Sequence, residues 1–573
     1  MRGQGYGNIP LGPYRFTPTL SLPTVLKHTD PTQFEVLSGK KFYSKDTGLA
    51  FPTLYDDTGR VPIPGVDADG TYRTRWNAVS HNGVIHSNSN YSYNHAFNQR
   101  MLIDRTDDEG RSIHADYIKR QTDFLDSDQQ LFTILEERYA RYFDGWLGRE
   151  RMAEEHNADT HPKKQLRMSG YKDRSESNLG ERVWLRLGML TYKLKKDEIG
   201  KPGKAGRTIG DLGVEASLQG AWSTQRDKMA VKEDILLTTG DWTTRVHFCS
   251  APTENELKSV FENLIFPPEN AYFVYFSDDS CYAVHTPTGV KRANVDISSC
   301  DASHSDRLFT KFRDLHPAGA PRDDTAVLVE QCRAPIRIRA PDKVDGKKLR
   351  IILKSKYARL FSGSTLTTVM NGFGNKCIAQ SLHNAKATTR DEIVAAAALV
   401  GYVVTVDMCD QIEDLQFLKS SPVLSISGEY KPLLNIGVLL RAFGTCKGDL
   451  PGKGPFSQEK CDAFQKGLLQ GLYPNVSFPF LDKLKNLYAG AKDVNNTEQI
   501  KREYEYKCTN TTGTFTDEAV FKRYSVERAG VKYPLGDDSL AGLEELCHIP
   551  FGYEHASDGA DAVLLKDYGL RCW

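Results

Sequence analysis

Two apolar runs joined by an acidic turn constrain this chain more than any other segment. Residues 272–276 (YFVYF) and 281–284 (CYAV) are aromatic or otherwise apolar, and the polar segment between them contains Asp278 and Asp279. Apolar runs on both sides of a short polar segment predict a β-hairpin with carboxylates at its tip. Two adjacent acids on a tight turn repel each other unless a cation or water screens them. Taken alone, such a turn is more often an ordinary solvated surface feature than a functional site.

A second acidic segment follows directly. Residues 292–304 place Asp296 near a strand end and Asp301 shortly after it. If this strand lies beside the hairpin, Asp278, Asp279 and Asp296 supply the hard oxygen ligands that Mg²⁺ prefers. Two such ions about 3.5–4 Å apart can activate a hydroxyl group and stabilise a leaving pyrophosphate. The sequence therefore predicts that these three aspartates are catalytic and bind Mg²⁺, which Mn²⁺ can replace.

A third polar segment precedes an expected helix. It contains Ser362, Gly363, Thr367 and Asn371. Glycine allows an unusual turn, and the other side chains offer polar groups near a helix start. Alone this pattern indicates a capped helix; beside the acidic segments it indicates nucleotide recognition.

Together the three segments resemble the palm motifs of viral RNA-dependent RNA polymerases. Asp296-x4-Asp301 followed by Ala-Ser resembles motif A, and Ser277-Asp278-Asp279 resembles motif C. The segment 362–371 matches the motif B pattern S-G-x3-T-x3-N at every specified position. Motif C precedes motif A here, so the order C-A-B is similar to the permuted polymerases of birnaviruses and permutotetraviruses.

The resemblance implies an α+β fold with the right-hand polymerase architecture: fingers, a palm with an antiparallel sheet and permuted connectivity, and a helical thumb. It implies an RNA-directed RNA polymerase that replicates and transcribes a viral RNA genome by two-metal-ion nucleotidyl transfer from NTPs to an RNA 3′-hydroxyl. Asp301, Ser362, Gly363, Thr367 and Asn371 would contact the nucleotide. Within this set, Asp301 and Asn371, with help from Thr367, would read the 2′-hydroxyl.

The same resemblance divides the chain. The expected parts are an N-terminal region with fingers (1–235), a first palm segment (236–301), a fingers insertion (302–360), a second palm segment (361–428), and a thumb with the C-terminal region (429–573).

Two basic segments fit an RNA enzyme. Residues 193–209 carry six basic and two acidic side chains and resemble motif F, so Lys196, Lys204 and Arg207 are expected to bind the triphosphate. Residues 335–359 hold nine basic and two acidic side chains. This segment predicts an RNA-contacting strand, with an exposed edge strand blunted by charge as the alternative.

The helix expected at 391–399 and the strand expected at 401–406 resemble motif D, although residues 390–418 contain no lysine to act as a general acid. Residues 417–421 resemble motif E. A literal Gly-Asp-Asp at 536–538 lacks apolar strands on both sides, so it is interpreted as a loop that caps a helix. Asp323-Asp324 is another weak candidate.

Composition excludes several classes. Lys+Arg and Asp+Glu both total 74, which argues against a histone-like protein or a basic coat arm. The eleven cysteines contain no C-x-x-C pair, so free thiols are expected rather than a zinc site or a disulfide scaffold. No signal peptide is expected, and the longest apolar stretch, 393–406, is too short to span a bilayer.

The expected partners are template and nascent RNA, NTPs, and other viral replication or capsid proteins. The expected location is the host cytoplasm, with the virion as a second one. A reverse transcriptase-like polymerase and a non-enzymatic RNA-binding viral protein stay as alternatives.

Overall fold

The computed structural model describes residues 113–143, 234–319 without Ser299, 367–443, 457–493, 509–548 and 558–569. Outside these ranges it describes isolated residues and the paths of several strands. These strands are β1 (Arg15–Thr17), β2 (Phe34–Leu37), β3 (Gly65–Val66), β4 (Tyr72–Arg73), β5 (Ser80–His81), β6 (Val84–His86), β7 (Ala158–Arg167), β8 (Gly170–Asn178), β14 (Ile336–Val344) and β15 (Lys347–Ser355).

A six-stranded, mostly antiparallel sheet lies at the centre of the described chain, with the order β16-β13-β12-β11-β10-β9. Its strands are β9 (Ile235–Thr239), β10 (Trp242–Phe248), β11 (Ala271–Phe276), β12 (Asp279–Thr286), β13 (Gly289–Ile297) and β16 (Val404–Met408). Within this six-stranded sheet, only β10 and β11 pair in parallel. Because β11, β12 and β13 are consecutive in sequence and adjacent in the sheet, the hairpin predicted around residue 278 is confirmed and the next strand lies directly beside it.

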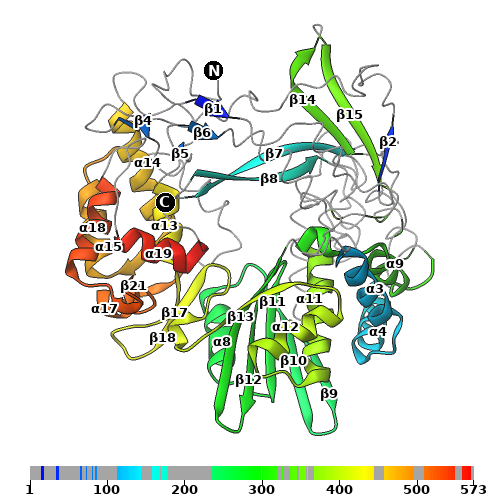
Figure 1. Ribbon diagram of the computed structural model, residues 1–573. Coiled ribbons are helices and arrows are strands. Elements are labelled where there is room, and N and C mark those ends of the chain that lie inside the picture. Colours follow the sequence, from blue (N-terminus) through cyan, green and yellow to red (C-terminus); the bar gives the residue numbers. More distant parts are fainter. Residues whose placement is uncertain are drawn as a thin grey trace, which may run out of the picture.

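Both faces of this sheet are covered. Alternate strand residues such as Phe273 and Val295 face a large apolar core shared with helices of the first face. These helices are α3 (Ile113–Asp126), α4 (Gln130–Phe143), α9 (Asp306–Asp314), α11 (Thr367–Ala385) and α12 (Arg390–Leu399). The intervening residues, such as Val274 and Ala283, face α8 (Glu254–Ile265) and the loop around Phe417. Figure 1 shows α11 and α12 beside the sheet strands, with α3, α4 and α9 further out.

Several helices form where the sequence predicts them. Thr253 with Glu256 three positions later predicts a capping box and a helix over 253–264; α8 begins there, and both hydrogen bonds of the box are present. The spacing of Leu131, Leu135 and Tyr139 predicts a helix, and all three are buried on one side of α4. The helix expected at 391–399 is α12.

The strand after α12 starts later than expected. Gly401 has φ +81, and a Cβ at that position would lie 2.6 Å from the Tyr117 carbonyl oxygen, so a tight left-handed turn follows α12. The prediction that the strand begins at Gly401 is therefore wrong; β16 begins at Val404.

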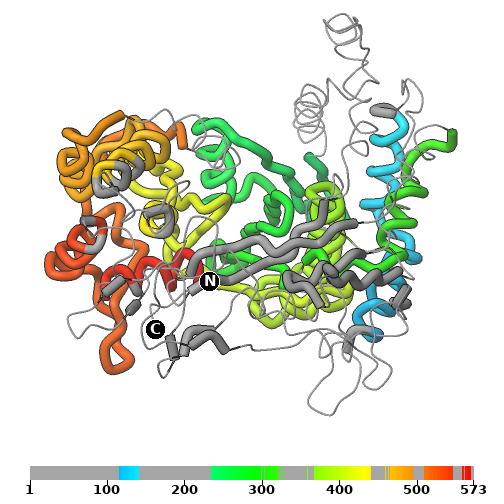
Figure 2. Tube along the Cα trace, turned by 90° about the horizontal axis from the view of Figure 1, so that it is seen from above, coloured from blue at the N-terminus to red at the C-terminus, as the bar shows by residue number. Residues whose placement is uncertain are grey.

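The C-terminal part is mainly helical and has its own apolar core. Its helices are α13 (Ile436–Phe443), α14 (Ser457–Leu472), α15 (Pro479–Tyr488), α17 (Asp517–Phe521), α18 (Asp537–His548) and α19 (Asp558–Tyr568). Its strands are β17 (Ser420–Leu424), β18 (Tyr430–Leu434), β19 (Asn475–Ser477), β20 (Thr512–Thr514), β21 (Ser525–Arg528) and β22 (Val531–Pro534). In both views the orange and red C-terminal helices lie on the opposite side of the molecule from the cyan α3 and α4 (Figures 1 and 2).

Five of the strands traced in the remaining chain form a second sheet, with the order β2-β15-β14-β7-β8. The basic segment 335–359 supplies its β14–β15 hairpin, which carries a register irregularity between Arg339 and Lys343. Six cysteines of the described residues are free thiols: Cys249, Cys281, Cys300, Cys377, Cys409 and Cys547. Within the same residues, no helix is both long and apolar enough to cross a bilayer.

Candidate active site

The acidic turn between β11 and β12 is a two-residue hairpin turn. Phe276 pairs with Asp279, so Ser277 and Asp278 form the turn itself. Ser277 has φ 54, the left-handed conformation that such turns require of their first residue. Asp278 follows it and is exposed. The turn therefore presents the Asp278 carboxylate at the end of the sheet.

Asp279 and Asp296 are direct cross-strand partners on β12 and β13. Directly opposed residues of antiparallel strands place their side chains on the same face, with Cβ atoms roughly 5 Å apart. The Asp296 side chain is exposed, whereas Asp279 is half-buried. Three aspartates thus stand at one end of two adjacent strands, as the sequence predicts.

The surroundings of Asp279 are unlike those of its two neighbours. Its Oδ2 accepts a hydrogen bond of 2.8 Å from the backbone amide of Leu418. Burial is the main cause that raises the pKa of this carboxyl group to about 7; the Leu418 amide and the charge of Lys419 oppose it, and the charges of Asp278 and Asp296 support it. Negative charge at this strand end is therefore only partly compensated by the protein.

The donor set fits a hard divalent cation that keeps other ligands. Within the described ranges, no three histidine, cysteine or acidic side chains form a group that could hold a metal ion by themselves. Mg²⁺ usually keeps several waters and shares substrate phosphates, with one or two protein carboxylates. The exposed carboxylates of Asp278 and Asp296 match that chemistry.

A polar group approaches the turn from α11, on the first face of the sheet. Asn371 Nδ2 donates to Ser277 Oγ at 3.1 Å and to Asp301 Oδ1 at 3.1 Å. Asn375, one helical turn further on, donates to the backbone oxygen of Ser277. Asp301 lies in the short helix η4 (Cys300–Ser303), just after β13. The structure thus joins residues of all three predicted motifs, although their roles with a nucleotide stay predictions.

Several predicted site residues lie elsewhere. Thr367 is half-buried at the first position of α11. The predicted nucleotide-binding residues Lys196, Lys204, Arg207, Ser362 and Gly363 lie outside the described residues.

The Gly-Asp-Asp at 536–538 has the local structure expected of it. Asp537 and Asp538 form the first turn of α18. This helix packs on α19 and α15 in the C-terminal part, away from the six-stranded sheet (Figure 1). The site at the end of β12 and β13 is therefore built without it.

The sequence analysis missed a buried network behind Asn371. His304 Nε2 lies 2.7 Å from Asn371 Oδ1, and His304 Nδ1 lies 2.8 Å from the Tyr402 hydroxyl. The only sequence signal was a histidine three positions after Asp301, and Tyr402 is distant in sequence.

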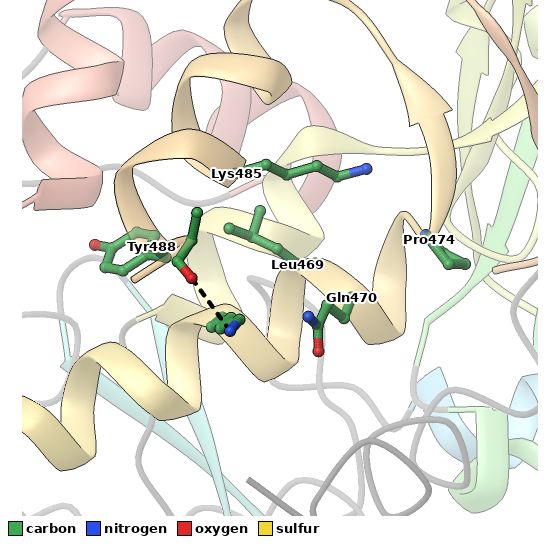
Figure 3. A pocket seen from close by; sticks show the side chains of 7 residues that line it. Leu469, Gln470, Pro474, Lys485 and Tyr488 are labelled. Atoms are coloured by element: carbon green, nitrogen blue, oxygen red, sulfur yellow. Dashed lines mark hydrogen bonds between the residues drawn. The ribbon is translucent and has the colours of Figure 1, made fainter. Parts of the chain in front are cut away.

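A cavity of about 350 Å³ lies in the C-terminal part, apart from the aspartates (Figure 3). It is lined by Lys466, Leu469, Gln470, Pro474, Lys485, Tyr488 and Ala489. Both lysines donate to backbone oxygens: Lys466 to Ala489 at 3.3 Å, and Lys485 to Tyr473 at 2.7 Å. Burial lowers the pKa of Lys485. Since both lysines donate to the fold, the cavity is a packing feature of α14 and α15.

No protein-family profile matches the chain, and no curated protein sequence matches it. Two solved structures are similar in part. One is the X-ray structure of the birnavirus VP1-VP3 complex, at 8% identity and a TM-score of 0.33, over 88% of this chain and 56% of that chain. The other is the RNA polymerase VP1 from Infectious Pancreatic Necrosis Virus, at 8% identity and a TM-score of 0.32, over 97% of this chain and 63% of that chain. This chain thus spans less than two thirds of either.

Proposed function

We propose that this protein is a viral RNA-directed RNA polymerase whose palm motifs run in the order C-A-B. The observation that carries the proposal is the direct pairing of Asp279 with Asp296, beside the turn that presents Asp278. The hydrogen bonds from Asn371 to Ser277 and Asp301 link the proposed motif B to the turn and to the end of β13.

The sheet accounts for the unusual motif order. A short turn carries the chain from Thr286 on β12 to Gly289 on β13, so the hairpin precedes its partner strand in sequence and still pairs with it. β16 closes the other side of β13. In the proposed right-hand architecture this sheet is the palm and the C-terminal helices are the thumb.

Asp278 and Asp296 are the proposed principal metal ligands, with Asp279 assisting. When bound, Mg²⁺ would supply Lewis-acid activation of the RNA 3′-hydroxyl and charge stabilisation of the leaving pyrophosphate. The Leu418 amide fixes one oxygen of Asp279, so this residue holds its position beside Asp296. Lys196, Lys204 and Arg207 would neutralise the triphosphate. Asp301 and Asn371, with Thr367, would recognise the ribose by binding its 2′-hydroxyl.

The test is nucleotide incorporation on a poly(rC) template with GTP and Mg²⁺. Asp278→Ala should reduce incorporation at least about 100-fold, because a metal clamp supplies several kcal/mol of charge stabilisation. Asp538→Ala, in the Gly-Asp-Asp of α18, is the matched control and should keep wild-type activity. Equal activity of the Asp278→Ala and wild-type proteins would refute the assignment of motif C.

Two outcomes separate the rival functions. A preference for dNTPs over NTPs would favour a reverse transcriptase-like polymerase. RNA binding without any metal-dependent incorporation would favour a non-enzymatic RNA-binding protein. Besides RNA and NTPs, other viral replication or capsid proteins stay predicted partners.

A further inference from the structure

Behind the ribose-reading pair lies a buried chain of hydrogen bonds that the proposed chemistry does not use. It runs from Tyr402, between α12 and β16, through His304, just before α9, to Asn371 on α11. Tyr402, His304 and Asn371 are each at most 2% exposed. This hydrogen-bond network ends at Ser277 and Asp301, which face the site.

The chemistry of these groups fixes the direction of each hydrogen bond. Asn371 Nδ2 carries two protons and has two acceptors, Ser277 Oγ and Asp301 Oδ1. The oxygen of the same amide, Asn371 Oδ1, therefore faces His304. An amide oxygen only accepts, so His304 Nε2 must donate to it. Burial lowers the pKa of His304, which favours the neutral ring. Its Nδ1 then accepts, and Tyr402 is the donor.

The Asn371 amide has a second donor to its oxygen. Cys300 Sγ lies 3.3 Å from Oδ1, so a thiol and an imidazole converge on the same atom. If the amide flipped, its NH₂ group would face the two donors and its oxygen would face the Asp301 carboxylate. Each of those contacts is unfavourable, so the network selects one of two nearly isosteric orientations.

α11 is shaped to admit this network. A Cβ at Gly374 would lie 2.6 Å from the Tyr402 hydroxyl and 3.0 Å from His304 Cε1. Any larger residue at this position would displace the two rings, so glycine lets them pack against the helix beside Asn371.

We propose that His304 is a positioning residue for ribose recognition: it holds the Asn371 amide so that Nδ2 faces Asp301 and Ser277. This inference rests on the proposed polymerase function. It predicts that His304 governs discrimination of NTPs from dNTPs. A buried polar site that loses its orientation loses affinity for the hydroxyl it was built to bind.

The experiment compares the kcat/KM for GTP with that for dGTP in primer extension. His304→Leu removes the donor and should lower the GTP:dGTP ratio about tenfold or more, mainly through GTP. His304→Gln can still donate and should stay within about threefold of the wild type. Tyr402→Phe removes the far donor, so it should shift the ratio in the same direction by a smaller factor.

Thermal unfolding identifies any variant that fails to fold. If His304→Leu fails to fold, the His304→Gln and Tyr402→Phe ratios decide. Equal losses for GTP and dGTP, or an unchanged ratio in every folded variant, would overturn the role of His304 while leaving the polymerase intact. A wild-type protein that incorporates neither nucleotide would overturn the proposed function, and the inference with it.

Discussion

Ser277 occupies a turn position that glycine usually fills. Its φ of 54 is unfavourable for a residue with a Cβ, and two asparagines of α11 hold it there. Asn371 binds its hydroxyl group and Asn375 its backbone oxygen. These hydrogen bonds from α11 therefore help to hold the turn that presents Asp278.

A second buried histidine has a different role. His316 follows α9, is stacked on Tyr139 with ring centroids 4.6 Å apart, and donates through Nδ1 to the Phe312 oxygen at 2.7 Å. Burial is the main cause that lowers its pKa to about 4; the hydrogen bond to the Phe312 oxygen opposes this shift, and the charge of Arg322 supports it. The folded protein therefore resists protonating this ring.

The sign of the resulting pH dependence follows directly. Because the pKa is lower in the folded than in the unfolded state, the stabilisation is complete above about pH 6.5 and is lost as pH falls toward 4. When the pH is lowered from about 7.5 to about 5.5, His316 should lower the free energy of unfolding by about 1 kcal/mol.

His316→Asn keeps a donor for the Phe312 oxygen and cannot bind a proton in this range. Urea unfolding at the two pH values should show a smaller loss in this variant. An identical loss in both proteins would exclude His316 as its source.

Single residues were predictable where the chemistry was local. Asp278, Asp279 and Asp296 stand out because carboxylates beside apolar strands are unusual, and Asp301 and Asn371 belong to a spaced pattern. His304 was not predictable, because its partner Tyr402 comes from a distant turn. Its position depends on how α11 and α12 pack, which no local pattern contains.

At the scale of elements, α8 shows how local chemistry fixes a boundary. The Thr253 side chain accepts from the Glu256 amide, and the Glu256 carboxylate accepts from the Thr253 amide, both at 3.3 Å. The buried Leu257, Val260 and Leu264 then hold the helix on the second face of the sheet. Cap and apolar spacing agree, so both were predictable.

Thr253→Ala should destabilise the first turn of α8 by about 0.5–2 kcal/mol, because the Glu256 amide loses its capping partner. Hydrogen exchange of the Glu256 amide should be faster, while exchange in the central sheet stays unchanged. Glu262→Ala, an exposed position of the same helix, should change stability by less than about 0.5 kcal/mol. Equal exchange at Glu256 in both variants would contradict the role of the cap.

Element boundaries were less predictable where tertiary packing decides them. The apolar run around residues 401–406 indicated one continuous strand. The structure instead uses Gly401 for a left-handed turn against Tyr117 of α3 and places Tyr402 in the network with His304. Contacts with α3 and α11 determine the backbone conformation at Gly401 and Tyr402. The periodicity of a single segment contains no information about such contacts.

At the scale of the whole molecule, the central sheet and the C-terminal helices have separate apolar cores. A buried ion pair of the C-terminal part lies against the loop after β16. Arg523, which follows α17, donates to Asp567 of α19 at 3.0 Å and to the Asp414 oxygen, in the loop after β16, at 2.9 Å. Asp567 also accepts from the Gly437 amide at 2.9 Å. These contacts tie the last described helix to the loop beside the predicted active site.

Asp567→Ala should destabilise the protein by about 3–5 kcal/mol, because it leaves the Arg523 charge buried and unpaired. Both side chains are nearly inaccessible, at 4% and 0% exposure. The matched control is Asp558→Ala on the same helix, where the pair with Arg528 is 68% and 69% exposed and about 0–1 kcal/mol is expected. Thermal unfolding with limited proteolysis should show early release of α19 in Asp567→Ala alone. Equal stability of the two variants would contradict the stabilising role of this ion pair.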